Sequence, residues 1–481
     1  MNLTQLEPQA VWKNFEALNA IPRPSKKEEK VIAFMKQFGE SLNLETTVDP
    51  TGNVIIRKPA TKGMENRKTV VLQSHLDMVC QKNNEVDFDF DTQGIQMEVK
   101  DGWVKAKGTT LGADNGLGVA AMMAVLESAD IAHPALEALF TIDEETGMTG
   151  AKGLKPGQLT GDILLNLDTE EDDEIDIGCA GGIDVTATAH FDTAPVEGSV
   201  FAIEVKGLQG GHSGMDIHKG LGNANVILGR LLYAGVEEHE LSLIEIDGGG
   251  LRNAIPREAS AVVAVSSSEA YLNKFEELKK AILEEFASLE PALALSISPS
   301  EHKKVGLSPR DSRRVVLSLC SAHNGVYRMS PDVENLVETS NNIARVELKE
   351  GGLKILCLSR SSVESTKAAV AAQLKSVFEL AGFEVKLTGD YPGWKPKPGS
   401  EIVKIMEALY ESNFGSRPHV VACHAGLECG IIGANYPQMD MVSFGPTIRG
   451  AHSPDEQANI ESTQKFWRFL KAILENIPEK K

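Results

Sequence analysis

Acidic and histidine side chains recur just after predicted strands in the first third of the chain. Segments 75–77 (His-Leu-Asp), 143–145 (Asp-Glu-Glu) and 166–168 (Asn-Leu-Asp) each follow a short apolar run that is typical of a buried strand. In an open α/β sheet, the ligand crevice lies beyond the carboxyl ends of the strands. We therefore expect these three segments to meet at one edge of a sheet.

Two further segments offer the same kinds of side chain. Asp114 lies in Gly-Ala-Asp-Asn-Gly before a predicted helix, and His452 lies in a late loop that contains Gly and Pro. Taken singly, each segment has an ordinary explanation: a helix cap for Asp114, a solvated turn for a histidine, a solvated acidic loop for 143–145. Three adjacent carboxylates nevertheless repel one another unless a cation gathers them.

The combined set has the chemistry of a metal centre. It joins imidazoles to carboxylates without cysteine, and this mixture of nitrogen and oxygen ligands suits zinc and also manganese or cobalt. Two ions about 3.5–4 Å apart could share one carboxylate and one water. Calcium fits poorly, because imidazole is a poor ligand for a hard cation.

The elements that must position these residues belong to an α/β fold. Apolar positions at helical spacing predict helices over residues 9–19 and 27–40, and a small, apolar helix over 116–127 packs on the predicted sheet. From about residue 185, the predicted strands alternate apolar and polar residues. This alternation predicts an α+β region whose sheet has one solvated face.

The length of 481 residues predicts two domains, because it exceeds what one hydrophobic core organises. We expect a discontinuous catalytic domain over residues 1–185 and 391–481, of the α/β class, with a mixed, largely parallel sheet flanked by helices. Residues 186–390 would form an inserted α+β lid domain. A weak internal similarity between the segments that follow residues 251 and 339 predicts two similar halves in this insertion. Two unrelated strand–helix units are the alternative.

The composition argues against several classes of protein. A net charge of −20 argues against binding to nucleic acid or anionic membranes, since nothing would neutralise the phosphates. The amino terminus has no basic segment followed by an apolar core, and no apolar stretch is long enough to span a bilayer. Six scattered cysteines without a Cys-x-x-Cys pair indicate a reduced, cytoplasmic chain.

The order and spacing of these motifs resemble the co-catalytic di-zinc peptidases, a family that includes carboxypeptidases, deacylases and dipeptidases. More narrowly, five motifs are similar to those of its aminoacyl-histidine dipeptidase (Xaa-His dipeptidase, carnosinase-type) branch: Ser74-His-Leu-Asp-Met-Val, Gly112-Ala-Asp-Asn-Gly, Asp143-Glu-Glu-Thr-Gly, Cys423-His-Ala-Gly-Leu-Glu-Cys-Gly and His452-Ser-Pro-Asp-Glu. The match covers nearly the whole chain. It implies metal-dependent hydrolysis of dipeptides, including β-alanyl-histidine (carnosine) and other Xaa-His peptides.

The resemblance also implies a role for each residue of the metal centre. His75 and Asp168 would bind one zinc ion, Glu145 and His452 would bind the other, and Asp114 would bridge both. The peptide bond that follows Asp114 would be cis, a geometry that is costly outside proline and is found mostly where function requires it.

The same resemblance makes Glu144 the general base and acid, and Asp77 the residue that orients His75. Two cations lower the pKa of a shared water towards neutrality. Glu144 would take the proton as the metal-bridging hydroxide attacks the scissile carbonyl, and would then deliver it to the leaving amine.

Three residues of the insertion are candidates for binding the substrate. By resemblance, His212 would help to polarise the scissile carbonyl and Asn253 would contact the substrate. Arg360 could hold the free carboxylate of a dipeptide, which would explain a preference for short substrates. The structural alternatives are a turn residue, a backbone cap and a surface ion pair. We expect His424 and Glu428 near the substrate, without an assigned role.

Other functions are compatible with the sequence. The same metal core would serve a tripeptidase or an N-acyl amino acid deacylase, because specificity resides on loops. A metal-binding scaffold that has lost catalysis is a different class of explanation, and the intact Glu144 argues against it. A homodimer is also compatible, although the second half of the insertion could replace a partner's lid and let each chain close its own site.

Overall fold

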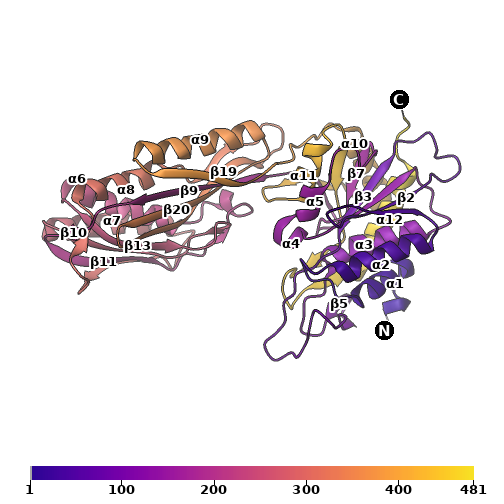
Figure 1. Cartoon of the computed structure of the whole chain (residues 1–481), viewed down its shortest axis with the longest axis horizontal. Coiled ribbons are helices and arrows are strands. Elements are labelled where there is room, and N and C mark those ends of the chain that lie inside the picture. Colours follow the sequence, from indigo (N-terminus) through magenta and orange to yellow (C-terminus); the bar gives the residue numbers. More distant parts are fainter. Residues whose placement is uncertain (1–2, 481) are drawn as a thin grey trace. The chain divides into compact units, whose positions relative to one another are not determined.

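The computed structural model describes residues 3–480, and the chain divides into two compact units. The first unit comprises Met1–Gly178, Pro396–Ala422 and Leu427–Lys481, and the second comprises Cys179–Lys395 and Cys423–Gly426 (Figure 1). The expected boundary at 185/186 lies inside the strand β9 (Gly181–His190), which belongs entirely to the second unit.

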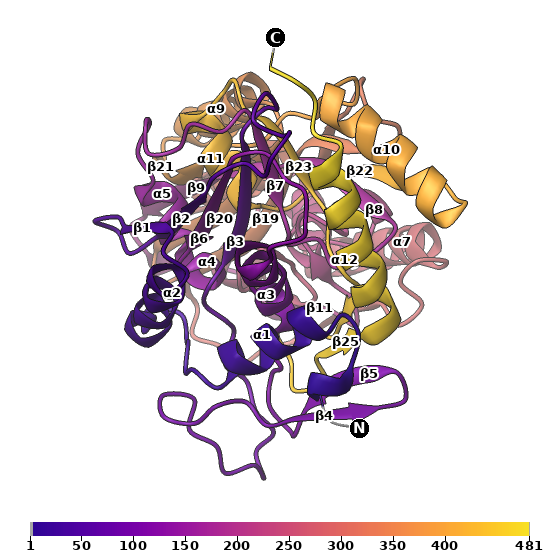
Figure 2. The ribbon, with the colours of Figure 1, turned by 90° about the vertical axis from the view of Figure 1, so that its right-hand side faces the viewer.

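An eight-stranded sheet in the order β1-β2-β6-β3-β7-β23-β8-β22 forms the centre of the first unit (Figure 2). The middle strands β6, β3, β7 and β23 run parallel, and antiparallel pairs flank them, which confirms the expected mixed sheet. The strand bounds are β1 Glu45–Val48, β2 Val54–Lys58, β3 Val70–His75, β6 Leu136–Thr141, β7 Ile163–Asn166, β8 Glu174–Cys179, β22 His419–Cys423 and β23 Asp440–Ser443.

Burial of the central strands explains their continuous apolar sequences. Every residue of β3, β6 and β7 is buried, as expected where a parallel sheet is covered on both faces. Helix α3 (Ala113–Glu127) packs against β3 and against α1 (Gln9–Asn19), and nearly all of its residues are buried. A Cβ on Gly118 would collide with the Ser74 hydroxyl and the Leu167 carbonyl, so a small residue lets α3 lie close to the strand ends.

The remaining elements of the first unit complete its shell. A small four-stranded sheet runs in the order β24-β25-β5-β4. Its strands and the other helices have these bounds: β4 Met97–Lys100, β5 Trp103–Ala106, β24 Ile448–Arg449, β25 Gln457–Asn459, η1 Leu3–Gln5, α2 Glu29–Ser41, α4 Glu144–Gly147, α5 Thr149–Gly153, α10 Glu401–Phe414, α11 Glu428–Asn435 and α12 Ile460–Glu475.

The second unit contains a sheet of antiparallel pairs in the order β16-β11-β15-β13-β19-β20-β9-β21, with β18 added beside β19. Side chains of four helices pack with one face of this sheet in a single hydrophobic core. The bounds are β11 Ser199–Lys206, α6 Ala224–Glu238, β13 Ser242–Gly249, β15 Ala259–Val265, α7 Ser268–Phe286, β16 Ala294–Pro299, α8 Pro309–Ser321, β18 Gly325–Met329, β19 Val337–Lys349, β20 Gly352–Ser361, α9 Glu364–Leu380 and β21 Glu384–Tyr391. The short elements are β10 Ala194–Pro195, β12 Gly211–His212, η2 Ile217–Lys219, β14 Ala254–Ile255 and β17 Val305–Gly306.

This sheet consists of two βαββαβ halves with the same strand order. One half is β11-α6-β13-β15-α7-β16, and the other is β9-α8-β19-β20-α9-β21, so the first half is inserted after β9 of the second. Strands β13 and β19, which have equivalent positions in the two halves, pair at the join. The two segments with weak sequence similarity lead into β15–α7 and β20–α9, which are also equivalent positions.

None of the helices within residues 3–480 combines the length and the apolar character needed to cross a membrane.

Candidate metal centre and substrate-binding residues

The proposed metal ligands come from five loops or element ends of the first unit. His75 is the last residue of β3, Glu145 lies in α4 directly after β6, and Asp168 follows β7. Asp114 lies at the start of α3, and His452 lies between β24 and β25. Because β3, β6 and β7 are parallel, their carboxyl ends bring the first three residues to the same edge of the sheet.

Asp114 contacts both histidines of the cluster. Its Oδ1 lies 3.1 Å from His75 Nε2, and its Oδ2 lies 3.1 Å from His452 Nε2. His75 Nε2 is also 3.6 Å from Asp168 Oδ1, and His452 Nε2 is 3.1 Å from Glu145 Oε2. The two oxygens of Asp114 therefore face two different histidine–carboxylate pairs. The peptide bond between Asp114 and Asn115 is cis, as expected.

Asp77 holds several parts of the site together. Its Oδ1 lies 3.4 Å from His75 Nδ1, and its two oxygens accept hydrogen bonds from the backbone N–H groups of Glu144 and Glu145. Ser25 Oγ donates to the same carboxylate at 2.8 Å. Burial opposes ionisation of Asp77, but the contact with His75 and the other donors lower its pKa to about 2. Asp77 therefore stays charged, which suits a residue that orients an imidazole.

The residues of the cluster fit a site for metal cations. The ligand atoms of His75, Asp114 and Glu145 lie within 4.8 Å of one another. Glu145 Oε1 and Asp168 Oδ1 are buried and have no hydrogen-bond partner among the described residues. Buried carboxylate oxygens without donors are costly unless a cation binds them, and the mixture of imidazole and carboxylate suits transition metals.

Charge in the cluster also favours a cation. Burial raises the pKa of Asp168 and of Glu144 well above the ordinary range, and neighbouring carboxylates add to the effect. Hydrogen bonding of His452 to the carboxylates of Asp114 and Glu145 raises the pKa of its imidazole to about 11. The histidine is thus driven to carry the positive charge that the carboxylates require, and a bound cation would supply that charge instead.

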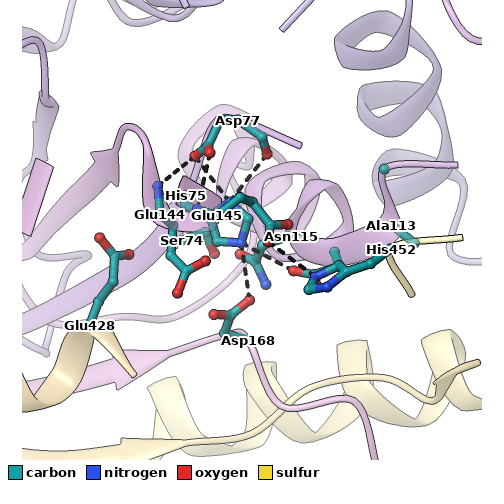
Figure 3. Close-up of polar contacts among 12 residues, drawn as sticks. Ser74, His75, Asp77, Ala113, Asn115, Glu144, Glu145, Asp168, Glu428 and His452 are labelled. Atoms are coloured by element: carbon teal, nitrogen blue, oxygen red, sulfur yellow. Dashed lines mark hydrogen bonds and ion pairs between the residues drawn. The ribbon is translucent and has the colours of Figure 1, made fainter. Parts of the chain in front are cut away.

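Glu428 lies beside this cluster, close enough that its charge affects Glu144 and Asp168 (Figure 3). Gln73 Nε2 and Thr141 Oγ1 each donate to its Oε2 at 2.7 Å, while its Oε1 is buried without a partner among the described residues. Burial raises the pKa of Glu428 to about 7. The sequence predicted its proximity to the substrate, but gave no sign of these partners, which belong to β3 and β6.

A buried hydrogen-bond chain continues from Gln73 across the strand ends. Asn166 Nδ2 donates to Gln73 Oε1 at 2.6 Å, and Ser443 Oγ donates to Asn166 Oδ1 at 2.5 Å. Thr169 Oγ1 lies 2.8 Å from Ser443 Oγ and 2.8 Å from Asp176 Oδ2. This chain connects β3, β7, β23 and β8 at the level from which His75 and Asp168 project.

The second unit brings His212, Asn253 and Arg360 close together through one serine. The N–H of Ser213 donates to the Asn253 carbonyl at 2.8 Å, and Arg360 Nε contacts Ser213 Oγ at 3.4 Å. Antiparallel pairing of β12 with β14 sets His212 opposite Ala254. Three residues far apart in the sequence thus form one group within this unit.

The tautomer of His212 is determined by its own loop. Its Nδ1 accepts hydrogen bonds from the N–H groups of Gly214 and Met215, at 3.2 and 3.0 Å. Burial, and then the charge of Arg360, lower its pKa. His212 is therefore a neutral imidazole with its proton on Nε2, which is the form that donates a hydrogen bond.

Arg360 is a buried cation whose hydrogen-bond partners are neutral. Its Nη1 donates to the Tyr391 hydroxyl at 3.1 Å. His424 lies in the same unit, with Nε2 2.7 Å from Ser340 Oγ. Burial and the nearby Arg360 lower the pKa of His424 to about 3, so this imidazole is neutral as well. A buried guanidinium whose hydrogen-bond partners are all neutral suits an anionic ligand.

Comparison with known proteins identifies the family. The model of peptidase family M20/M25/M40 matches residues 71–476, and the chain belongs to this family. The cytosol non-specific dipeptidase of Escherichia coli (strain K12) is 44% identical over 485 residues, which cover 99% of each chain. The crystal structure of the aminoacylhistidine dipeptidase from Vibrio alginolyticus is 45% identical, has a TM-score of 0.95, and is matched over 100% of this chain and 99% of that one. Aminopeptidase PepT from Bacillus cereus ATCC 10987, at 18% identity and a TM-score of 0.58, shares the fold over 98% of this chain and 99% of its own.

Proposed function

We propose that the chain is a metal-dependent dipeptidase that hydrolyses unblocked dipeptides, including Xaa-His peptides such as β-alanyl-histidine. The observation that carries the proposal is the position of Asp114, whose two oxygens face two histidine–carboxylate pairs close to Glu144. The names of the two most similar relatives described above support a dipeptide substrate. Membership of a peptidase family supports the reaction class.

His75, Asp168 and Asp114 would hold one cation, and Glu145, His452 and Asp114 would hold a second. When bound, such cations activate a water and polarise the scissile carbonyl. We propose zinc as the metal, with manganese or cobalt as functional substitutes, because the ligands are imidazole and carboxylate without thiolate.

Glu144 acts as the proton carrier in this proposal. Its carboxylate adjoins the proposed ligand Glu145, so it would take a proton from water and return it to the leaving amine. Asp77 holds the backbone N–H groups at the start of α4, so it positions Glu144 as well as His75.

The second unit would supply the contacts that select a dipeptide. His212 would donate from Nε2 to the developing oxyanion, since its other nitrogen is already occupied by two N–H groups. Arg360 would bind the free carboxylate of the second residue, and Asn253 would contact the substrate near both. A longer peptide has no carboxylate at that distance, so the clamp would disfavour tripeptides.

We place the enzyme in the cytosol, with small peptides as its partners and without nucleic acid or membrane. The net charge of −20 and the name of the Escherichia coli relative support this placement. The proposal is compatible with a homodimer.

A substrate panel tests the proposed function. The metal-replete protein is incubated with β-alanyl-histidine, several α-dipeptides, a tripeptide and an N-acetyl amino acid, each with and without a chelator. We expect rapid cleavage of the dipeptides alone, abolished by the chelator and restored by added zinc. Preferred cleavage of the tripeptide or the acetyl compound would support the corresponding tripeptidase or deacylase and would reject the role of Arg360.

A further inference from the structure

The side chain of Glu456 binds the backbone N–H groups of the loop that carries Asp114. The proposed reaction gives this carboxylate no role. Glu456 Oε2 accepts from the N–H groups of Leu111 and Gly112, at 2.7 and 3.0 Å. Its Oε1 accepts from the N–H groups of Ala113 and Asp114, at 2.7 and 3.3 Å. One buried carboxylate therefore satisfies four consecutive backbone donors where α3 begins, a position at which the helix dipole also favours negative charge.

Glu456 belongs to the same short loop as His452. The N–H of Glu456 donates to the Ser453 carbonyl, and the N–H of Ser453 donates to the Gly450 carbonyl, so the loop is closed by its own hydrogen bonds. His452 has a left-handed backbone conformation with φ of 63° inside it. The carboxylate of Glu456 thus ties the loop of one metal ligand to the loop of another.

The buried side chain of Arg23 donates hydrogen bonds to backbone carbonyl groups of the same region. Arg23 Nη2 donates to the Gly112 carbonyl at 2.6 Å, and Nη1 donates to the carbonyls of Leu76 and Asp77, at 3.0 and 3.1 Å. The Leu76 and Asp77 carbonyls directly follow His75, so Arg23 links the His75 segment to the Asp114 loop. A side chain at Gly112 would collide with the Arg23 guanidinium, which explains glycine there.

We propose that Glu456 and Arg23 are positioning residues that set the spacing of His75, Asp114 and His452 for metal binding. Glu456 joins the Asp114 and His452 loops, and Arg23 joins the Asp114 and His75 segments. Asp114 is shared by the two proposed metal sites. Its loop is held at its backbone N–H groups by Glu456 and at a backbone carbonyl group by Arg23. The inference rests on the proposed ligand set but not on the identity of the substrate.

Cobalt titration of the metal-free protein tests this proposal without an activity assay. The visible absorption of bound Co²⁺ reports the ligand geometry, and competition with a chelator of known affinity gives the dissociation constants. The test variant is Glu456→Gln, which has one acceptor oxygen in place of two and presents an NH₂ group to the backbone donors. The matched control is Asp455→Asn, which makes the same change of charge at the neighbouring, exposed position of the same loop.

We expect Glu456→Gln to weaken cobalt binding by roughly 10–100-fold and to change the cobalt spectrum, as is typical when residues that orient metal ligands are replaced. Asp455→Asn should leave both unchanged. Wild-type affinity and spectrum in Glu456→Gln would overturn the proposal, even if urea unfolds its metal-free form more easily. Should Glu456→Gln fail to fold, Arg23→Lys is measured in the same way, since a lysine has one nitrogen in place of the two that reach the two segments. Reduced affinity supports the proposal and unchanged affinity overturns it. Unchanged cobalt binding in the variants would not contradict the proposed dipeptidase function, and an unexpected result of the substrate panel would not contradict the positioning role of Glu456 and Arg23.

Discussion

Single residues of the site differ in how far the sequence could predict them. His75, Asp114, Glu145, Asp168 and His452 lie in motifs whose residue types already indicate a metal centre, and the structure brings all five together. Their assigned roles remain proposals.

Arg23 and Glu456, which form hydrogen bonds with the backbone of the ligand loops, could not be predicted from the sequence motifs. A lone arginine or glutamate in a sequence is most often a solvated surface residue. The burial of Arg23 and Glu456, and the convergence of backbone groups on them, arise only when distant segments meet in the fold.

Arg360 offers a prediction about substrate recognition. Arg360→Met should reduce kcat/KM for dipeptides by roughly 10–100-fold, because a hydrogen bond to a charged group contributes about 1.5–3 kcal/mol. It should have little effect on the corresponding dipeptide amides, which have no carboxylate to bind. Arg345→Met is the matched control, since that arginine already pairs with Asp247 and Glu347. An equal loss for acids and amides would show that Arg360 does not bind the carboxylate.

At the scale of elements, the sequence predicted which strands end at the site, but it did not predict the side-chain hydrogen bonds that connect those strand ends. Continuous apolar runs predicted β3, β6 and β7, and the rule for parallel sheets predicted that their carboxyl ends would meet. The hydrogen-bond chain through Gln73 and Asn166 has no local signal, because polar residues inside an apolar run do not reveal their partners.

The chain across the strand ends predicts a stability effect. Asn166→Leu should lower the free energy of unfolding by about 1–3 kcal/mol, because Gln73 Oε1 and the Ser443 hydroxyl lose their buried partner. The double variant Gln73→Leu/Asn166→Leu should be less destabilised than the sum of the two single variants. Urea unfolding of the metal-free protein measures both quantities. Strictly additive effects would show that the two amides do not depend on each other.

At the scale of the whole molecule, length and pattern predicted the α/β class with an inserted α+β region. They did not reveal that β9 belongs to the same half as β19, β20 and β21. The other half, β11 to β16, is inserted in the chain after β9. Strand pairing of this kind is non-local, and an alternating strand carries no information about which neighbour it will choose.

The stability of the molecule should depend on pH through His424. The folded state keeps this imidazole neutral down to about pH 3, whereas the unfolded chain takes up a proton near the ordinary pKa of 6.5. The stabilisation is therefore present above pH 6.5 and is lost progressively as the pH falls towards 3. Glu428 contributes to the free energy of unfolding with the opposite sign. Because its pKa is raised to about 7 in the folded state, this contribution increases as the pH falls from about 7 to 4.5.

His424→Gln isolates the histidine contribution. The glutamine can still bond with Ser340 but cannot take up a proton. Between pH 7 and pH 4.5, we expect the free energy of unfolding to fall by up to about 2.5 kcal/mol less in the variant than in the wild-type protein, as measured by urea titration. Parallel pH profiles for the two proteins would contradict the assignment of a buried, neutral His424.

The most direct test of the central claim is the Glu144→Gln variant, in which metal content and turnover are measured on the same sample. We expect the variant to retain the wild-type metal content, because Glu144 is not among the five proposed ligands. We also expect dipeptide hydrolysis to fall by at least about 100-fold, because no group remains to carry the proton from water to the leaving amine. Wild-type turnover at full metal content would contradict the account.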